Sequence, residues 1–388
     1  MNEPVLVLRA LGLGDALTAV PALRGLRRLH PDRPLILAGT EPVGSWLRDQ
    51  GLVDDVILLR DLDDHPPGAD LGPHLAVDLH GRGPQSHRLL LEGKPTELIA
   101  FDCPEAGHYS PSVWREDEHE VHRWCRLLTD AGAPCTPADL RLPPPTTPAQ
   151  HALSHLPSRG STKPPAARAD PATGTGPPSA TPAPAVPAPS VDPVLAVAAP
   201  SADPVSGVAV ASAHPATDGL VVLVDPGDER RVVLVHPGAA SGSRRWPANR
   251  WITVVRALRE RDLRVLITGS CAEHDLCREI AEASDAEDLS GTLDLDDLAT
   301  LVYSAELLIS GDTGVAHLAT AYGTRSVTLF GPTPPTWWGP AIDLDLHTVI
   351  YKAKPDYRGN PHAADPDPAL LAITPTEVLS ASHPHLTA

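Results

Sequence analysis

The sequence has few aromatic residues and no long apolar run. Phe, Tyr and Trp make up 4% of the 388 residues, whereas hydrophobic residues make up 42%, enough for ordinary cores. No stretch of 18 or more apolar residues occurs, so we expect no membrane-spanning helix. The chain passes from Met1 into a strand-like run at Val5–Leu8 without a basic segment, and we expect no signal peptide.

An excess of positive charge is also missing. The formal net charge of −18 argues against nucleic acid as the main partner, since that binding depends on concentrated Lys and Arg, although a local basic cluster can still hold a small anion. The five cysteines are odd in number and form no Cys-x-x-Cys pair, so neither a disulfide framework nor a metal site is expected. We predict a cytoplasmic protein whose cysteines are buried: Cys103, Cys125, Cys135, Cys271 and Cys277.

No Phe, Tyr or Trp occurs between Trp124 and Trp246, and Pro, Ala, Ser and Thr dominate from about 142 to 230. Such a segment buries too little apolar surface to offset its ordering entropy, and proline-rich tracts favour extended conformations. We therefore predict a disordered inter-domain linker over 142–230, within which the run Leu220–Val224 is compatible with a strand. An insert of about 90 residues is tolerable because closure entropy grows only with the logarithm of length.

Strand-like and helical patterns alternate on both sides of this linker, which predicts mainly parallel sheets covered on both faces. The expected strands are Val5–Leu8, Leu35–Ala38, Val56–Leu59, Leu75–Leu79, Leu98–Phe101, Val232–Val235, Leu263–Thr268, Leu307–Ser310 and Ser326–Phe330. The expected helices are Asp15–Leu29 (kinked by Pro21), Pro42–Gln50, Asp117–Ala131, Pro247–Arg261, Ala272–Ala283, Leu295–Val302, Gly314–Tyr322 and Pro375–Ser382.

The alternation predicts an α/β protein with two Rossmann-like domains facing a cleft. Their two facing sites suggest transfer of a group from a phosphorylated donor. The N-terminal domain is expected over 1–141 and would hold the acceptor of that group. The C-terminal domain is expected over 231–373 and would hold the donor. Residues 374–388 are expected to form a terminal helix and tail, because Thr374 and Glu377 make a capping box with Pro at the first helical position.

The first motif is Gly12-Leu13-Gly14-Asp15, at the first strand-to-helix turn. It fails as a dinucleotide fingerprint because Leu17 occupies the third glycine position. Asp15 would either cap the helix, favoured by the helix dipole, or act as a general base towards an attacking hydroxyl. Both interpretations stay open at this point.

The second motif follows Val232–Val235. Small residues at 238–243 precede Arg244 and Arg245, and a helix is expected from Pro247. Glycine-rich loops before helix N-termini bind phosphate through backbone amides, and arginines add charge-assisted donors. We predict donor phosphate contacts at Ser241, Ser243, Arg244 and Arg245, with a solvated basic loop as the alternative. Trp246 and Trp251 are expected to be packing residues.

The third motif is Gly311-Asp312-Thr313-Gly314, followed by His317. Asp312 is expected to be the N-cap of the next helix, so that the amides of Thr313, Gly314 and Val315 form a second anion site. His317 would lie near that helix end, as a phosphate ligand or a structural histidine. Gly269 and Glu273 lie at another strand-to-helix turn, where Glu273 would accept from ribose hydroxyls or simply favour the helix dipole.

These motifs together resemble glycosyltransferase family 9, the ADP-heptose:lipopolysaccharide heptosyltransferases. The resemblance rests on Arg9–Asp15 with Pro21, on His236–Ala239 with Arg245–Pro247, on Gly311–Gly314 with His317, and on Leu329–Thr333. It covers about 1–135 and 231–388. A lysine usual in the family appears here as Arg244 or Arg245, and the proline-rich insert is not a family feature.

The resemblance implies a GT-B fold and an inverting, metal-independent transfer of a sugar from a nucleotide diphosphate donor, with ADP-heptose as the candidate. It implies Asp15 as the base, Arg245 with residues 312–314 at the donor phosphates, and Glu273 near the ribose. No cofactor is expected. The partners would be the nucleotide sugar and a glycan or glycolipid acceptor. A lipid-linked acceptor would require peripheral contact with the inner face of the plasma membrane.

Two other functions are compatible with the sequence. A non-catalytic protein that binds sugar nucleotides could use the insert as an interaction arm. An NAD-dependent oxidoreductase would also have Rossmann-like halves, but the incomplete glycine fingerprint at 12–17 counts against it. The sequence does not decide the acceptor or the oligomeric state.

Overall fold

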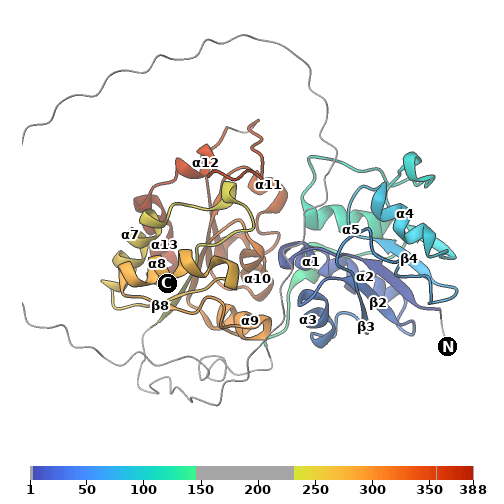
Figure 1. Ribbon diagram of the computed structural model, residues 1–388, viewed down its shortest axis with the longest axis horizontal. Helices are drawn as coiled ribbons and strands as arrows, with labels where there is room; N and C mark the ends of the chain where they lie inside the picture. The colour runs from blue at the N-terminus through green and yellow to red at the C-terminus, as the bar shows by residue number, and fades with distance from the viewer. Residues whose placement is uncertain (1–2, 146–230, 355, 388) are drawn as a thin grey trace, which may run out of the picture. The chain divides into compact units, whose positions relative to one another are not determined.

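The computed structural model describes residues 3–145, 231–354 and 356–387 (Figure 1). The predicted disordered linker lies outside the described residues from residue 146 on, as does Leu220–Val224. The domain boundaries stay predictions. In the described ranges, no helix combines the length and apolarity needed to cross a membrane.

The N-terminal half contains a parallel sheet of five strands in the order β3-β2-β1-β4-β5. Its strands are β1 (Val5–Leu8), β2 (Leu35–Gly39), β3 (Asp55–Leu58), β4 (Leu75–Asp78) and β5 (Glu97–Ile99). Its α-helices are α1 (Leu13–Thr18), α2 (Val20–Leu29), α3 (Val43–Asp49), α4 (Gln85–Glu92) and α5 (Glu120–Asp130).

The C-terminal half contains a parallel sheet of six strands in the order β11-β10-β9-β6-β7-β8. Its strands are β6 (Val232–His236), β7 (Arg264–Ile267), β8 (Glu287–Asp288), β9 (Leu307–Gly311), β10 (Ser326–Phe330) and β11 (His347–Tyr351). Its α-helices are α7 (Ala248–Arg259), α8 (His274–Ser284), α9 (Leu295–Ser304), α10 (Gly314–Tyr322), α11 (Pro335–Trp338), α12 (Pro368–Leu371) and α13 (Pro375–Thr387).

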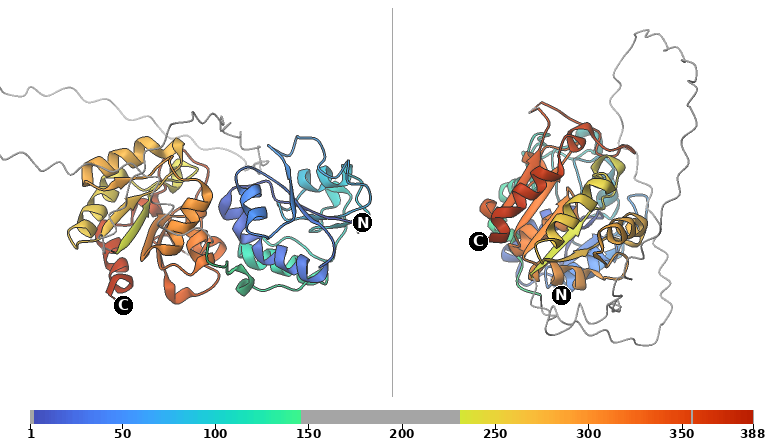
Figure 2. Two further views of the ribbon diagram at one scale, coloured as in Figure 1. Left: turned by 90° about the horizontal axis from the view of Figure 1, so that it is seen from below. Right: turned by 90° about the vertical axis from the view of Figure 1, so that its left-hand side faces the viewer.

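Helices cover both faces of each sheet (Figures 1 and 2). Successive strand residues point to opposite faces, so Val5 and Val7 pack with α1, α2 and α5 while Leu6 and Leu8 pack with α4. In the second sheet Val233 and Val235 pack with α7, α8 and α13. Burial on both faces explains why these strands are continuous apolar runs without polar alternation.

Both sheets place their first strand in the middle, so the strand order reverses beside it. The reversal lies between β1 and β4 in the first sheet and between β6 and β9 in the second. Ligands of open α/β sheets bind beyond the carboxyl ends of the strands at such a reversal. The turn with Asp15 follows β1, and the two predicted phosphate turns follow β6 and β9. The topology therefore places the three motifs where this fold class binds ligands.

Several predicted elements differ from the structure. The helix expected over Asp15–Leu29 is divided at Ala19, because Pro21 cannot continue the hydrogen-bond ladder. The C-terminal helix runs five residues further than the predicted end at Ser382, to Thr387, despite Pro384, because His385 and Leu386 are buried against the second half. Five elements of the structure were not predicted from the sequence: α4, α11, α12, β8 and β11.

Candidate functional site

Asp15 lies in the first turn of α1, not at its cap, because the N-cap residue is Gly12. Its side chain is 35% exposed, and Oδ1 lies 3.6 Å from Nη2 of Arg9. Burial raises the pKa of Asp15, and Arg9 and Arg244 oppose that rise, whereas Glu120 adds to it. The carboxylate is thus reachable from solvent and electrostatically coupled to cations from both halves of the chain.

Arg244, at the end of the short 3₁₀ helix Gly242–Arg244, is the arginine of the second half whose charge lowers the pKa of Asp15. Its Nη1 donates to the backbone oxygen of Asp312 over 3.4 Å and its Nε to Ser241 Oγ over 3.4 Å. Arg245 turns to the backbone instead, because its Nε donates to Ala239 O over 2.9 Å. The structure therefore separates two arginines that the sequence could not distinguish.

Two donors of the loop at 238–243 are already occupied by hydrogen bonds to a second segment of the chain. The N–H of Ser243 donates to Ala363 O over 2.9 Å, and Ser241 Oγ donates to Pro361 O. Ser243 is buried, and its Oγ lies 3.2 Å from Ser241 Oγ. The Ser243 amide is therefore not free to bind an anion, because Ala363 O already accepts its hydrogen bond. The phosphate contacts at Ser241 and Ser243 stay predictions.

The turn after β9 also differs from its prediction. Thr313 is the N-cap of α10, because its Oγ1 accepts from the N–H of Val315 over 3.3 Å. The expectation that Asp312 caps the helix is wrong, and the Val315 amide is satisfied within the protein. Within the described residues the N–H groups of Thr313 and Gly314 have no hydrogen-bond acceptor. Those two amides are the donors left for an anion.

Asp312 is buried beside Arg244 and Asp15. Burial, more than the negative charge of Asp15, raises its pKa to about 6, and Arg244 acts in the opposite direction. Two carboxylates that share one arginine disfavour each other's ionisation. Asp312 is thus a second carboxyl group near Asp15 with a raised pKa.

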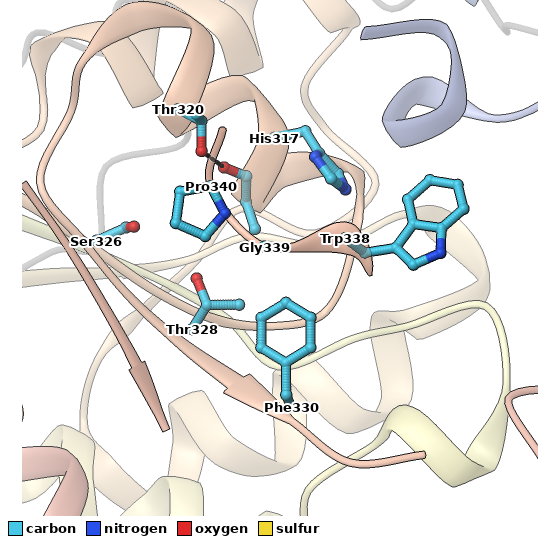
Figure 3. Close-up of a pocket in the computed structure, with 9 residues that line it drawn as sticks. His317, Thr320, Ser326, Thr328, Phe330, Trp338, Gly339 and Pro340 are labelled. Carbon is cyan, nitrogen blue, oxygen red and sulfur yellow. Dashed lines mark hydrogen bonds between the residues drawn. The ribbon is translucent and has the colours of Figure 1, made fainter. Parts of the chain in front are cut away.

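His317 lies one turn into α10 against the start of α1, so close that a Cβ on Gly14 would lie 2.9 Å from its Cδ2. Burial lowers the pKa of His317 to about 4, with further lowering by nearby cations, so the ring is neutral at pH 7. The ring meets Trp338 edge to face, with 6.0 Å between centroids. Both line a small pocket with side chains of β10 (Figure 3): Thr328 and Phe330.

Glu273 lies at the turn after β7, where it completes a capping box with Ser270 at the start of the following helical segment. Its Oε2 accepts from the N–H and the Oγ of Ser270, both over 2.8 Å. A Cβ on Gly238 would lie 2.1 Å from its Oε1, so a larger residue there would displace the Glu273 carboxylate. Gly269 is close-packed in a similar way against Cys277 Sγ, at 2.6 Å from a built Cβ.

The structure brings Asp15, Arg244, Asp312, Thr313, Gly314 and His317 together at the junction of α1 and α10. Glu273 and Gly269 lie at the turn after β7, where Glu273 packs against Gly238 of the loop that leads to Arg244. Four of the predicted buried cysteines are buried, whereas Cys271 is exposed, because it lies in the turn before α8.

Two sets of residues at the site were missed from sequence. Arg9 and Glu120 are both buried and charged, and they contact each other. Arg9 also lies next to Asp15. The segment 357–367 covers the loop at 238–243: Ser243 donates to Ala363 O, and Asp367 N–H donates to Ser243 O over 3.1 Å. The signal for Arg9 was available, since it is a charged residue directly after a buried strand. The covering segment carries no such pattern.

Residues 188–359 match the model of the family described as glycosyltransferase family 9 (heptosyltransferase). Lipopolysaccharide heptosyltransferase 2 of Escherichia coli strain K12 is 28% identical over 147 residues, which cover 35% of this chain and 41% of that protein. Part of this chain is therefore similar to the heptosyltransferases of glycosyltransferase family 9. The resemblance predicted from the motifs is thereby confirmed, although the alignment spans about two-fifths of that relative's length.

Solved structures show the fold of this chain. A family 9 glycosyltransferase from Veillonella parvula superposes with a TM-score of 0.68 at 15% identity, covering 99% of this chain and 97% of that one. The E. coli ADP-heptose lipopolysaccharide heptosyltransferase II gives a TM-score of 0.66 at 16% identity, with coverage of 99% and 98%. The predicted GT-B fold is confirmed.

Proposed function

We propose that this protein is an inverting glycosyltransferase that moves a heptose from ADP-heptose to a hydroxyl of a glycan or glycolipid acceptor. Asp15 is the general base that removes the proton of the attacking hydroxyl. The observation that carries the proposal is the contact between the turn of the partly exposed Asp15 and the turn of Asp312 and Thr313, where a Cβ on Gly314 would lie 3.0 Å from the backbone nitrogen of Gly14.

Inversion requires a base on the sugar face opposite the leaving group, and the transition state resembles an oxocarbenium ion. Asp15 is suited to that role because its carboxylate is accessible while Arg9 favours its ionised form. A base of this kind contributes about 10²–10⁴-fold to the rate. The similarity to heptosyltransferases supports heptose as the sugar.

The departing diphosphate needs donors that stabilise its growing negative charge. Arg244 and the amides of Thr313 and Gly314 are the groups we assign to this role, with Ser241, Ser243, Arg245, Asp312 and His317 around them. We propose that these protein donors replace a divalent cation. In the described ranges no group of three or more His, Cys, Asp or Glu side chains is arranged to hold a metal ion.

The nucleoside is proposed to lie at the turn after β7, where Glu273 accepts from the ribose hydroxyls and Gly269 lets the chain pass close to it. The acceptor is proposed to bind to the N-terminal half, at the loops after β1 and β4. We place the reaction in the cytoplasm, with contact at the inner face of the plasma membrane for a lipid-linked acceptor.

A thermal-shift screen tests the donor class directly. ADP, GDP, UDP and dTDP sugars are compared with NAD, with and without EDTA, and the anomeric configuration of any product is read by NMR. We expect ADP-heptose to raise the melting temperature most, without sensitivity to EDTA, and the product to have inverted configuration. Stabilisation by NAD alone, a retained configuration, or loss of turnover in EDTA would overturn the corresponding part of the proposal.

A further inference from the structure

Arg9 lies directly after β1, and its side chain is 2% exposed. Its guanidinium donates to the backbone oxygen of Asp15 through both Nε, over 2.9 Å, and Nη2, over 2.7 Å. Nη2 also donates to Thr18 Oγ1 over 3.0 Å, and Nη1 donates to Leu79 O. One buried cation therefore joins the turn after β1 to the turn after β4.

A buried guanidinium needs a counter-charge, because an unpaired buried ion is very costly. Glu120, at the start of α5, supplies it, with Oε1 3.3 Å from Arg9 Nη2. Glu120 is itself held in place: Trp124 Nε1 donates to Oε1 over 2.9 Å, and Arg123 donates to Oε2. The indole of Trp124 also lies under the guanidinium, 4.9 Å from Arg9 Cζ.

The same Arg9 faces the carboxylate of Asp15, since Nη2 lies 3.6 Å from Oδ1. Arg9 is almost fully enclosed, whereas Asp15 is partly exposed. Arg9 thus lies between two carboxylates, the buried Glu120 and the partly exposed Asp15. This arrangement holds the Asp15 turn from the protein interior and leaves part of its carboxylate exposed for a substrate.

We propose that Arg9 is a positioning residue that fixes the turn of Asp15 and sets the protonation of its carboxylate, with Glu120 acting on that protonation in the opposite sense. The catalytic meaning of this pair rests on the proposed function, in which Asp15 is the base. The effect of Arg9 and Glu120 on the protonation of Asp15 does not depend on that function.

The two charges have opposite consequences for Asp15. A cation within about 4–6 Å lowers a carboxyl pKa by about 1–3 units, and a nearby anion raises it. The other charged or titratable groups near Asp15 come from the second half: Arg244, Asp312 and His317. These three residues are kept in the variants of Arg9 and Glu120, so each variant removes or replaces one member of the buried pair only.

The experiment is a carboxyl ¹³C NMR titration of the full-length protein labelled at aspartate, with the Asp15 signal assigned by its loss in Asp15→Asn. The variants are Arg9→Met, Arg9→Lys and Glu120→Gln. The control is Arg24→Met, which removes an arginine of the same half that donates to backbone oxygens of Asp139 and Arg141, away from Asp15. Circular dichroism melts verify that each variant is folded.

We expect Arg9→Met to raise the Asp15 pKa by about one unit or more and Glu120→Gln to lower it, with Arg9→Lys restoring most of the wild-type value. Arg24→Met should leave it unchanged. An Asp15 titration that does not move in Glu120→Gln, or that moves in the same direction in Arg9→Met and Glu120→Gln, would overturn the inference. Glu120→Gln decides the matter alone if Arg9→Met does not fold.

Turnover with ADP-heptose is measured on the same proteins. The acid limb of its pH profile should follow the NMR shift, moving to higher pH in Arg9→Met and to lower pH in Glu120→Gln. An acid limb that fails to follow the shift would contradict the link between the pair and catalysis. If the wild-type protein shows no transferase turnover, only the proposed function is contradicted. The NMR titration still tests the effect of Arg9 and Glu120, because it does not require turnover.

Discussion

The backbones of Gly14 and Gly314 are in close contact where α1 and α10 begin, so that a Cβ on Gly314 would lie 3.0 Å from the backbone nitrogen of Gly14. The same Cβ would lie 3.0 Å from the Cβ of Leu13. This contact joins the turn that carries Asp15 to the turn that carries Asp312 and Thr313. The two glycines therefore allow the first and second halves of the site to meet.

Gly314→Ala should weaken that junction. The added methyl group meets backbone and a side chain that is itself packed, and such overpacking costs about 1–3 kcal/mol. Gly12→Ala is the matched control, because a Cβ there meets nothing within 4 Å and its φ is −71°. We expect a lower melting temperature for Gly314→Ala and a nearly unchanged one for Gly12→Ala. Equal melting temperatures would refute the packing role of Gly314.

Arg244→Met should weaken binding of ADP by about 10–100-fold, the equivalent of one lost charge-assisted hydrogen bond of about 1.5–3 kcal/mol. Arg245→Met should have a smaller effect, because its Nε is directed to Ala239 O. Isothermal titration calorimetry with ADP measures both. The reverse order of effects would show that Arg245, and not Arg244, is the phosphate ligand.

His347 predicts a pH dependence of stability. It is buried in β11, where its Nδ1 contacts Ser326 Oγ over 2.9 Å, and burial lowers its pKa from 6.5 to about 4. Between those pH values the unfolded chain binds a proton at this residue and the folded protein does not. The free energy of unfolding therefore falls as the pH falls from 6.5 to 4, by about 3 kcal/mol from this group.

His347→Gln removes this term, so its stability should fall less than that of the wild type between pH 6.5 and 4 in urea titrations. The lowered pKa of His317 also makes the free energy of unfolding fall as the pH falls, whereas the raised pKa of Asp312 has the opposite effect. Both residues remain in the variant, so their effects cancel in the comparison. His383→Gln on the exposed side of α13 is the control. Parallel curves for the wild type and His347→Gln would contradict the prediction.

The sequence was sufficient for the parallel architecture, because strands buried on both faces are uninterrupted apolar runs bounded by turn residues. Val5–Leu8 and Ser326–Phe330 have the predicted bounds. The strand β11 (His347–Tyr351) was missed although its residues Thr348, Val349 and Ile350 are β-branched and favour strands. Helix ends such as Thr387 depend on tertiary packing and are not encoded locally.

For the site, the sequence identified the turns but not the partners within them. It placed Asp312 at the cap, where local propensity is equally good for the neighbouring Thr313 that occupies it. It assigned Gly14 and Gly314 to backbone turns, and their mutual contact needs both halves of the chain. The covering segment at 357–367 and the pairing of Arg9 with Glu120, 111 residues apart, follow only from the fold.

Asp15→Asn tests the central claim most directly. Turnover of ADP-heptose and the dissociation constant of ADP are measured on the same preparation, with the melting temperature as the check on folding. The account predicts that turnover falls by about 10²–10⁴-fold while the dissociation constant changes little, because a base acts on the acceptor hydroxyl and not on donor binding. Unchanged turnover in a folded Asp15→Asn protein would contradict it.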